Sequence, residues 1–396
     1  MKSNRFLIIS ALCLAVMKCE YDVTQPKWYQ DYTEPASPAI TNIEPDSAVA
    51  GCNYINIIGE NFSGTPTVYF DNVTAEVISN LGNSIQVRRP NLASDGCLVK
   101  VACDSALVVA QSTEPYKITQ VVQKYGNFVE NKELNAVAVD SAENVYVIDY
   151  TNIIYKVTPA GDKTTMLDKA KRTTYDATLG PDGKLYLLGN NRSIDVLDPQ
   201  SGKVAEWIKL KAGKVVKFGD FDKNGYLYTG GRSTGLVVVA PDLTPNYTSL
   251  YEKDEIKGIR VFGNYVYVSL VCTTPDLQNP ALAIWRNPID NSGNPGEKEL
   301  VLDLTAYKNY SADALNSFSL SSDGKLFLGI NAQTPLLAID LNTTSADYFY
   351  LGIIAPYCKS FSWGRGNYLY MICGDTALRV EWTLYRIDMG VTSTRE

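Results

Sequence analysis

The chain has 396 residues, with 36 lysine and arginine residues against 43 aspartate and glutamate residues and a formal net charge of −7. This length predicts two or three domains, each large enough to bury a core without disulfide support. The chain contains no histidine, which excludes Ser-His-Asp and Cys-His catalysis and histidine metal ligands. A hydrophobic fraction of 45% is typical of a globular protein, and the negative charge offers nucleic acid no overall attraction.

The first residues have the pattern of an export signal. Lys2 and Arg5 precede an apolar run over residues 6–17, which is too short to span a bilayer and fits the core of a signal peptide. Cys19 follows this run and resembles the lipidated cysteine of bacterial lipoproteins, although Lys18 stands where those signals have a small residue. An uncleaved anchor and ordinary secretion therefore remain alternatives.

We expect a signal peptide over residues 1–18 and a polar tether over residues 19–37, attached to the membrane through a lipid on Cys19. Glu20 and Asp22 resemble the acidic surface-export signals of Bacteroidetes lipoproteins. The expected location is the outer membrane, facing the cell surface. A periplasmic or secreted protein is the alternative.

Short alternating strands fill residues 38–117. Ile55 and Ile57 alternate with polar neighbours, as do Ile85 and Val87, and turn residues separate the strands, which predicts a β-sandwich. The run Gly-Glu-Asn-Phe at 59–62 resembles the IPT/TIG domain, an immunoglobulin-like module. The resemblance implies a spacer or interaction domain without catalytic residues.

From about residue 135 a pattern of short strands recurs six times. Each repeat has a tight polar turn and then a strand that carries an aromatic residue. The aligned aromatic residues are Tyr146, Tyr186, Tyr228, Tyr267, Phe327 and Tyr370, spaced 40, 42, 39, 60 and 43 residues apart. Such periods are typical of propeller blades, and Asp-Gly and Asn-Gly pairs suit hairpins that need a positive φ. The expected fold class is all-β, an immunoglobulin-like sandwich followed by a six-bladed β-propeller.

The repeats resemble the NHL and gluconolactonase-like class of six-bladed propellers, most closely at 144–149 (Asn-Val-Tyr-Val-Ile-Asp). We assign residues 118–396 to the propeller. The last repeat ends at Asp388, which leaves little chain for a fourth strand. Apolar and polar residues alternate over 118–124, and we expect this segment to close the ring as the outer strand of the sixth blade.

Two cysteines are placed to form a disulfide. Cys358 and Cys373 are equidistant from the turn at 365–366, so an antiparallel hairpin would set them face to face. Buried, reduced thiols are the alternative. The sequence has no Cys-x-x-Cys spacing, so neither a zinc site nor a dithiol redox motif is expected.

Candidate ligand-binding residues lie in the loops between second and third strands and between blades, which form the usual ligand face of a propeller. Their aromatic, amide and arginine side chains can stack on sugar rings and hydrogen-bond to hydroxyls or carboxylates. These candidates are Tyr150, Asn190, Arg192, Arg232, Tyr307, Tyr310, Asn331, Gln333, Tyr357 and Trp382. The alternative is that these loops are polar because they face water.

Two enzymatic alternatives stay open. The resemblance to gluconolactonases implies a divalent metal, for which calcium suits the oxygen ligands, but only Glu133 lies near the required position. A glycosidase needs two carboxylates roughly 5–9.5 Å apart, to which Asp149, Asp220, Asp313 and Asp375 could contribute. Nothing in the sequence pairs these acids. We therefore assign no catalytic residue, no metal ligand and no cofactor.

These observations predict a non-catalytic binding lipoprotein whose propeller face recognises a glycan or a cell-surface protein. The glycan hypothesis rests on a resemblance in architecture to accessory lipoproteins of Bacteroidetes glycan-uptake systems. The alternatives are an adhesion or scaffold module that binds proteins, and a metal-dependent lactonase or carboxylate-based glycan-active enzyme.

Overall fold

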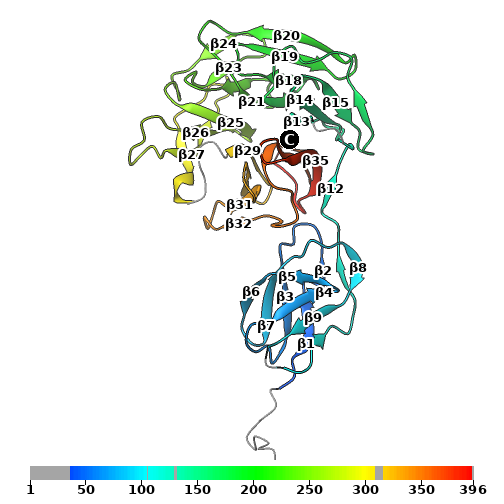
Figure 1. The fold of residues 1–396 in the computed structure, drawn as a ribbon. Coiled ribbons are helices and arrows are strands. Elements are labelled where there is room, and N and C mark those ends of the chain that lie inside the picture. Colours follow the sequence, from blue (N-terminus) through cyan, green and yellow to red (C-terminus); the bar gives the residue numbers. More distant parts are fainter. Residues whose placement is uncertain (1–35, 105, 129–131, 308–314, 395–396) are drawn as a thin grey trace, which may run out of the picture.

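The computed structural model describes residues 36–104, 106–128, 132–307 and 315–394. Over these residues the regular structure is β-strand apart from one short 3-10 helix, η1 (Leu304–Ala306). Figure 1 shows a small sandwich beside a larger ring of sheets, which confirms the predicted fold class. The predicted signal peptide, Cys19, the tether up to residue 35, Tyr310 and Asp313 lie outside the described residues.

The sandwich consists of three small sheets. Their strand orders are β1 (Ala39–Glu44), β3 (Tyr54–Glu60), β7 (Ser84–Arg88), β6 (Val77–Asn80); β10 (Ala110–Gln111), β9 (Val99–Ala102), β4 (Thr67–Phe70), β5 (Val73–Ala75); and β2 (Ser47–Ala48), β11 (Tyr116–Ile118), β8 (Ser94–Cys97). The apolar residues that alternate in the sequence, including Ile55, Ile57, Ile85 and Val87, have no exposed surface. Alternation along each strand therefore places one set of side chains in the core.

The ring consists of six antiparallel four-stranded sheets, one per blade. The first three blades are β13 (Leu134–Val139), β14 (Val145–Asp149), β15 (Ile154–Val157), β16 (Lys163–Thr165); β17 (Asp176–Leu179), β18 (Leu185–Leu188), β19 (Ser193–Asp198), β20 (Lys203–Lys209); and β21 (Phe218–Phe221), β22 (Leu227–Gly230), β23 (Val237–Val239), β24 (Pro245–Tyr247). The last three are β25 (Glu255–Phe262), β26 (Tyr265–Val271), β27 (Leu282–Pro288), β28 (Glu299–Asp303); β29 (Leu315–Leu320), β30 (Lys325–Ile330), β31 (Leu336–Asp340), β32 (Ala346–Tyr348); and β33 (Cys358–Trp363), β34 (Tyr368–Asp375), β35 (Val380–Asp388), β12 (Val122–Lys124).

The first strands of neighbouring blades contact one another around the ring, so these six strands line its central channel. The aromatic residue that marks each repeat lies on the second strand and is buried. Tyr146 and Tyr228 have no exposed surface, and Tyr370 is 1% exposed. These aromatic side chains thus fill the core around the blades, which is the packing role that their regular spacing suggests.

The sixth blade is completed by a strand from the other end of the propeller sequence. β12 pairs antiparallel with β35, with Val122 opposite Ile387 and Lys124 opposite Tyr385. The closing strand is shorter than the expected segment 118–124, because Ile118 pairs with Ala48 and belongs to the sandwich. A second link crosses between blades six and five, where the backbone N–H of Ser322 donates to the carbonyl of Thr392 at 2.9 Å.

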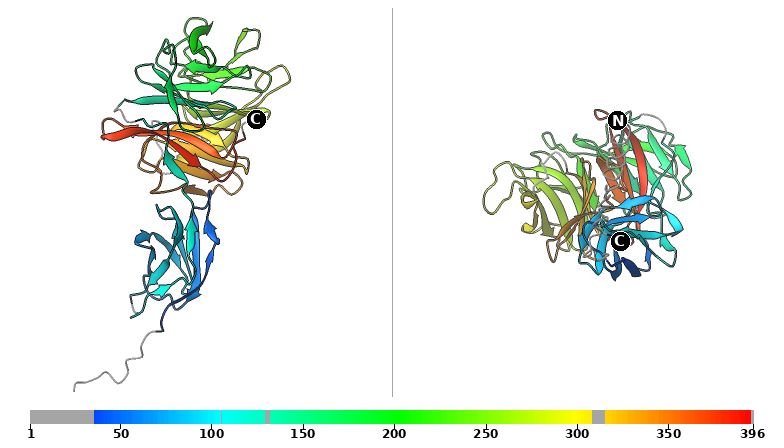
Figure 2. Two further views of the ribbon diagram at one scale, coloured as in Figure 1. Left: turned by 90° about the vertical axis from the view of Figure 1, so that its right-hand side faces the viewer. Right: turned by 60° about the horizontal axis from the view of Figure 1, so that its bottom comes forward.

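Tyr350, directly after β32, joins the sandwich to the ring. Its side chain is 2% exposed, and its hydroxyl accepts from the backbone N–H of Gly51 at 2.6 Å and donates to the carbonyl of Asp388 at 2.8 Å. Arg89 of the sandwich stacks over the Tyr350 ring, with 5.7 Å from its guanidinium carbon to the ring centre. The left view in Figure 2 shows the sandwich at one side of the ring.

A second contact between the two bodies involves Asp347 of β32. Its carboxylate accepts from the Tyr54 hydroxyl at 2.5 Å and pairs with Arg88 at 3.6 Å. The sandwich is therefore held through β32 and the segment after it, as well as through the chain that leads into β12.

The substitution Tyr350→Phe keeps the ring and removes the hydroxyl that bonds to Gly51 and Asp388. We expect the free energy of unfolding of the propeller to fall by about 1–3 kcal/mol, since a partly buried donor and acceptor lose their partner. Urea unfolding followed by tryptophan fluorescence measures this, because residues 38–117 contain no tryptophan. Tyr150→Phe is the control, since Tyr150 is 59% exposed. Equal unfolding midpoints for Tyr350→Phe and the native chain would contradict the expectation.

Candidate functional site

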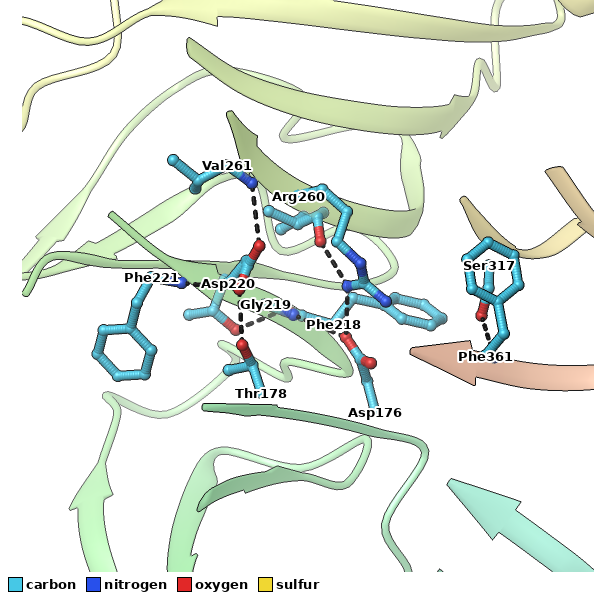
Figure 3. A network of polar contacts seen from close by, with 12 residues as sticks. Asp176, Thr178, Phe218, Gly219, Asp220, Phe221, Arg260, Val261, Ser317 and Phe361 are labelled. Atoms are coloured by element: carbon cyan, nitrogen blue, oxygen red, sulfur yellow. Dashed lines mark hydrogen bonds and ion pairs between the residues drawn. The ribbon is translucent and has the colours of Figure 1, made fainter. Parts of the chain in front are cut away.

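The central channel contains a buried network of charged and polar side chains from blades two, three and four. Asp176 and Thr178 of β17, Asp220 of β21 and Arg260 of β25 converge there, as Figure 3 shows. Asp176, Thr178 and Asp220 are each less than 8% exposed. Sequence reasoning singled out Asp220 and missed the other three, although a charged residue inside an apolar first strand was a signal of this site.

Arg260 forms an ion pair inside the channel. Its Nη1 lies 3.3 Å from Oδ2 of Asp176 and donates to the carbonyl of Ile259 at 2.7 Å. Burial by itself would lower the pKa of Arg260, but the carboxylates of Asp176 and Asp220 outweigh it and raise that pKa. Burial raises the pKa of Asp176, and Arg260 opposes this effect. Arg260 is therefore the built-in cation of the channel.

Asp220 links three neighbouring blades. Its Oδ1 accepts from the Thr178 hydroxyl at 2.6 Å, and its Oδ2 accepts from the backbone N–H of Val261 at 3.1 Å. A carboxylate that already accepts from both neighbouring blades holds their first strands together. The burial of Asp220 is therefore explained by its hydrogen bonds between blades.

This set of side chains does not suit a divalent metal. Within the described part of the chain, no three aspartate, glutamate or cysteine side chains gather closely enough to hold an ion. The guanidinium of Arg260 lies against Asp176, and Glu133 pairs with Lys359 at 3.5 Å. Glu133, the glutamate that the sequence placed nearest to the position of a lactonase ligand, is therefore engaged in an ion pair.

The channel has two openings. We call them the turn mouth, where the first strands end in hairpin turns, and the start mouth, where the first strands begin. The turn mouth holds a cavity of about 350 Å³. Residues from blades one, two, three, four and six and from the C-terminal segment line it, including Asp140, Ser141, Pro181, Phe221, Asp222, Lys223, Arg365 and Thr394.

The acids at the turn mouth are part of the hairpin turns. Oδ1 of Asp140 accepts from the backbone N–H groups of Ala142 and Asn144, both at 2.9 Å. Oδ1 of Asp222 accepts from those of Asn224 and Tyr226 in the same way. Burial raises the pKa of Asp222, although its backbone hydrogen bonds oppose this. An acid that recurs at one turn position in several blades stabilises the turn, and this role accounts for the position of both residues.

The predicted ligand residues lie around the start mouth in separate groups. Gln333 donates to the hydroxyl of Tyr357, so blade five and the segment that leads into blade six meet there. Trp382 is 8% exposed and its Nε1 donates to Thr376 at 2.9 Å, while Nζ of Lys359 lies 5.9 Å from the centre of its ring. Tyr150, at 59% exposure, presents its ring to solvent.

The remaining candidates do not join these groups by any hydrogen bond within the described residues. Asn190, Arg192, Arg232 and Asn331 are exposed on their loops. The hydroxyl of Tyr307 donates to the carbonyl of Thr344 at 3.0 Å, in the turn between β31 and β32, which places Tyr307 at the outer rim. Two candidate acids also serve turns: Asp149 accepts from Ile153 and Asp375 from Leu378.

Cys358 and Cys373 face each other in the ladder between β33 and β34, as their spacing predicted. Both are fully buried free thiols. Burial raises the pKa of each thiol. The disulfide itself stays a prediction.

The substitution Arg260→Gln leaves Asp176 buried without its cation. We expect a loss of about 3–5 kcal/mol in the free energy of unfolding. The pKa of Asp176 in the folded state would rise further above its unfolded value, so stability falls as pH rises through the folded-state pKa. The loss in the free energy of unfolding caused by Arg260→Gln should therefore be larger at about pH 8 than at about pH 5.

Denaturant unfolding at the two pH values measures this difference. Arg286→Gln is a matched control, because Arg286 pairs with Glu299 at 2.8 Å while 39% exposed and should cost at most about 1 kcal/mol. A pH-independent deficit for Arg260→Gln, or equal costs for both variants, would contradict the role assigned to the pair.

Comparisons with known proteins support the two-part architecture. The model of the IPT/TIG domain matches residues 38–119. No curated protein matches the sequence. In the described part of the chain, no helix has the length and apolar content needed to cross a membrane.

Several solved structures share the fold at low identity. An auxiliary nutrient binding protein from Bacteroides thetaiotaomicron is 11% identical, with a TM-score of 0.53 over 92% of this chain and 100% of that one. Another from Bacteroides ovatus is 13% identical, with a TM-score of 0.51 over 90% and 99%. A gluconolactonase-like protein is 11% identical, with a TM-score of 0.51 over 70% and 94%. The chain thus carries an IPT/TIG domain at residues 38–119, followed by a six-bladed β-propeller with the fold of the gluconolactonase-like proteins.

Proposed function

We propose that this protein is a non-catalytic binding protein at the cell surface, and that the cavity at the turn mouth holds a glycan. The cavity of about 350 Å³ is the observation that carries the proposal. Its volume lies at the small end of the range for small-molecule sites, which suits a short saccharide. Its walls come from separate blades, so the folded ring assembles it.

The lining has the chemistry that a saccharide needs. Ser141, Lys223 and Arg365 are exposed and supply hydrogen-bond donors, while Pro181 and Phe221 supply apolar surface for the faces of sugar rings. Because Asp140 and Asp222 already stabilise turns, the site can bind hydroxyl groups but has no free carboxylate pair for hydrolysis.

The other parts of the proposal concern location. The predicted signal peptide and lipidated Cys19 would attach the protein to the outer membrane, with the IPT/TIG domain as a spacer that lifts the propeller from the surface. Two structures with the same fold are described as auxiliary nutrient binding proteins of Bacteroides species, which agrees with a binding role in an exported protein.

A glycan array probed with residues 20–396, with and without EDTA, tests the proposal. We expect saccharide binding that survives EDTA and leaves the sugar intact. Ser141→Trp fills the cavity from an exposed position and should weaken binding at least about tenfold. Ser201→Trp, at an exposed serine in the turn between β19 and β20, is the matched control and should leave binding unchanged.

Three outcomes would overturn the proposal. Equal binding by Ser141→Trp and the native chain would show that the ligand does not bind at the turn mouth. Turnover of the bound sugar would show that the protein is an enzyme. An array without any bound saccharide, together with a specific protein partner recovered in a pull-down, would favour the scaffold function.

A further inference from the structure

Three lysines gather at the start mouth, the opposite end of the channel from the proposed glycan cavity. Lys217 directly precedes β21, while Lys257 and Lys359 lie near the beginnings of β25 and β33. Because these three strands line the channel, their first residues surround one opening. The side chain of Lys257 is 13% exposed and that of Lys359 is 31% exposed, so the lysines do not simply project into solvent.

Two of the lysines have carboxylate partners and the third has none. Nζ of Lys257 lies 3.5 Å from Glu255, and Nζ of Lys359 lies 3.5 Å from Glu133. Among the described residues, no carboxylate lies within ion-pair distance of Lys217. Its Nζ lies instead 4.7 Å from the ring centre of Tyr175 and 5.1 Å from that of Phe218.

Lys217 is therefore a partly buried cation that forms no ion pair with any described carboxylate. Burial lowers its pKa, the ammonium groups of Lys257 and Lys359 lower it further, and the carboxylates of Glu255 and Asp176 oppose this without reversing it. An anion at this point would restore the charge-assisted hydrogen bonds that burial takes from the ammonium group. The three lysines and Arg260 face the carboxylates of Glu255, Glu133 and Asp176, so one net positive charge remains, which matches a single carboxylate better than a doubly charged phosphate.

Tyr175 adds a second element of recognition. It directly precedes β17 and is partly exposed beside Lys217. An aromatic ring next to an ammonium group presents a flat surface for a sugar and a charge for its acid group. We propose that the start mouth binds a carboxylate-bearing sugar of the uronic acid class, with Lys217 pairing with the carboxylate and Tyr175 packing against the sugar ring.

Calorimetric titration of residues 20–396 with a trimer of galacturonic acid tests this site, with the neutral galactose trimer as the comparison ligand. We expect the acidic trimer to bind, the neutral one not to bind, and the affinity to fall with added salt. Lys217→Met keeps the apolar stem and should weaken binding at least about tenfold, while Lys217→Arg keeps the cation and should retain it.

Lys211→Met is the matched control and should bind the acidic trimer like the native chain. Its Nζ also lies over a tyrosine, 4.0 Å from the ring centre of Tyr247. Ser141→Trp, which fills the turn mouth, should also leave this binding unchanged, so the proposals for the two sites can be tested independently.

No binding of the acidic trimer at millimolar concentration, or equal binding of both trimers, would overturn the proposal. A shifted unfolding midpoint with unchanged binding in Lys217→Met would show that Lys217 serves only packing.

Discussion

Closure of the ring is the constraint on which the rest of this molecule depends. A sheet edge left open in the sixth blade would expose unpaired backbone groups, and β12 removes that edge by pairing with β35. The strand that does this comes directly from the sandwich, so completing the propeller also brings the two domains together. Tyr350 then bonds to Gly51 and to Asp388 next to the same junction. The closing strand and the domain interface therefore support each other.

The closed ring also explains why charged groups can be buried at its axis. Each first strand contributes polar side chains to a narrow channel where little water competes, so they must satisfy one another. Arg260 compensates Asp176, and Asp220 accepts from both neighbouring blades. The two proposed ligand sites lie at the openings, with hydroxyl, cationic and apolar groups at the turn mouth and ammonium groups beside an aromatic ring at the start mouth.

The fold could be predicted from the sequence because its signals are local. Alternation at Ile55 and Ile57 reports which face of a strand is buried, and the recurring turns with their aromatic residues report the blades. Even the position of Cys358 opposite Cys373 in the strand ladder followed from counting residues away from one turn. The extent of the closing strand was less accurate, since Ile118 has a partner in the sandwich that local alternation does not reveal.

What the sequence by itself determined is the order of strands, the number of blades and the side chains that form the cores, because these depend on contacts between neighbours along the chain. Only the tertiary structure decided which polar groups meet. Asp176 and Arg260 are 84 residues apart and belong to blades that are not adjacent, yet they form an ion pair because the ring brings their strands to one axis. Lys217 and Lys359, from blades three and six, come near enough at the start mouth for the charge of one to lower the pKa of the other, for the same reason. Convergence at an axis depends on the curvature of the whole ring, and no local pattern encodes it.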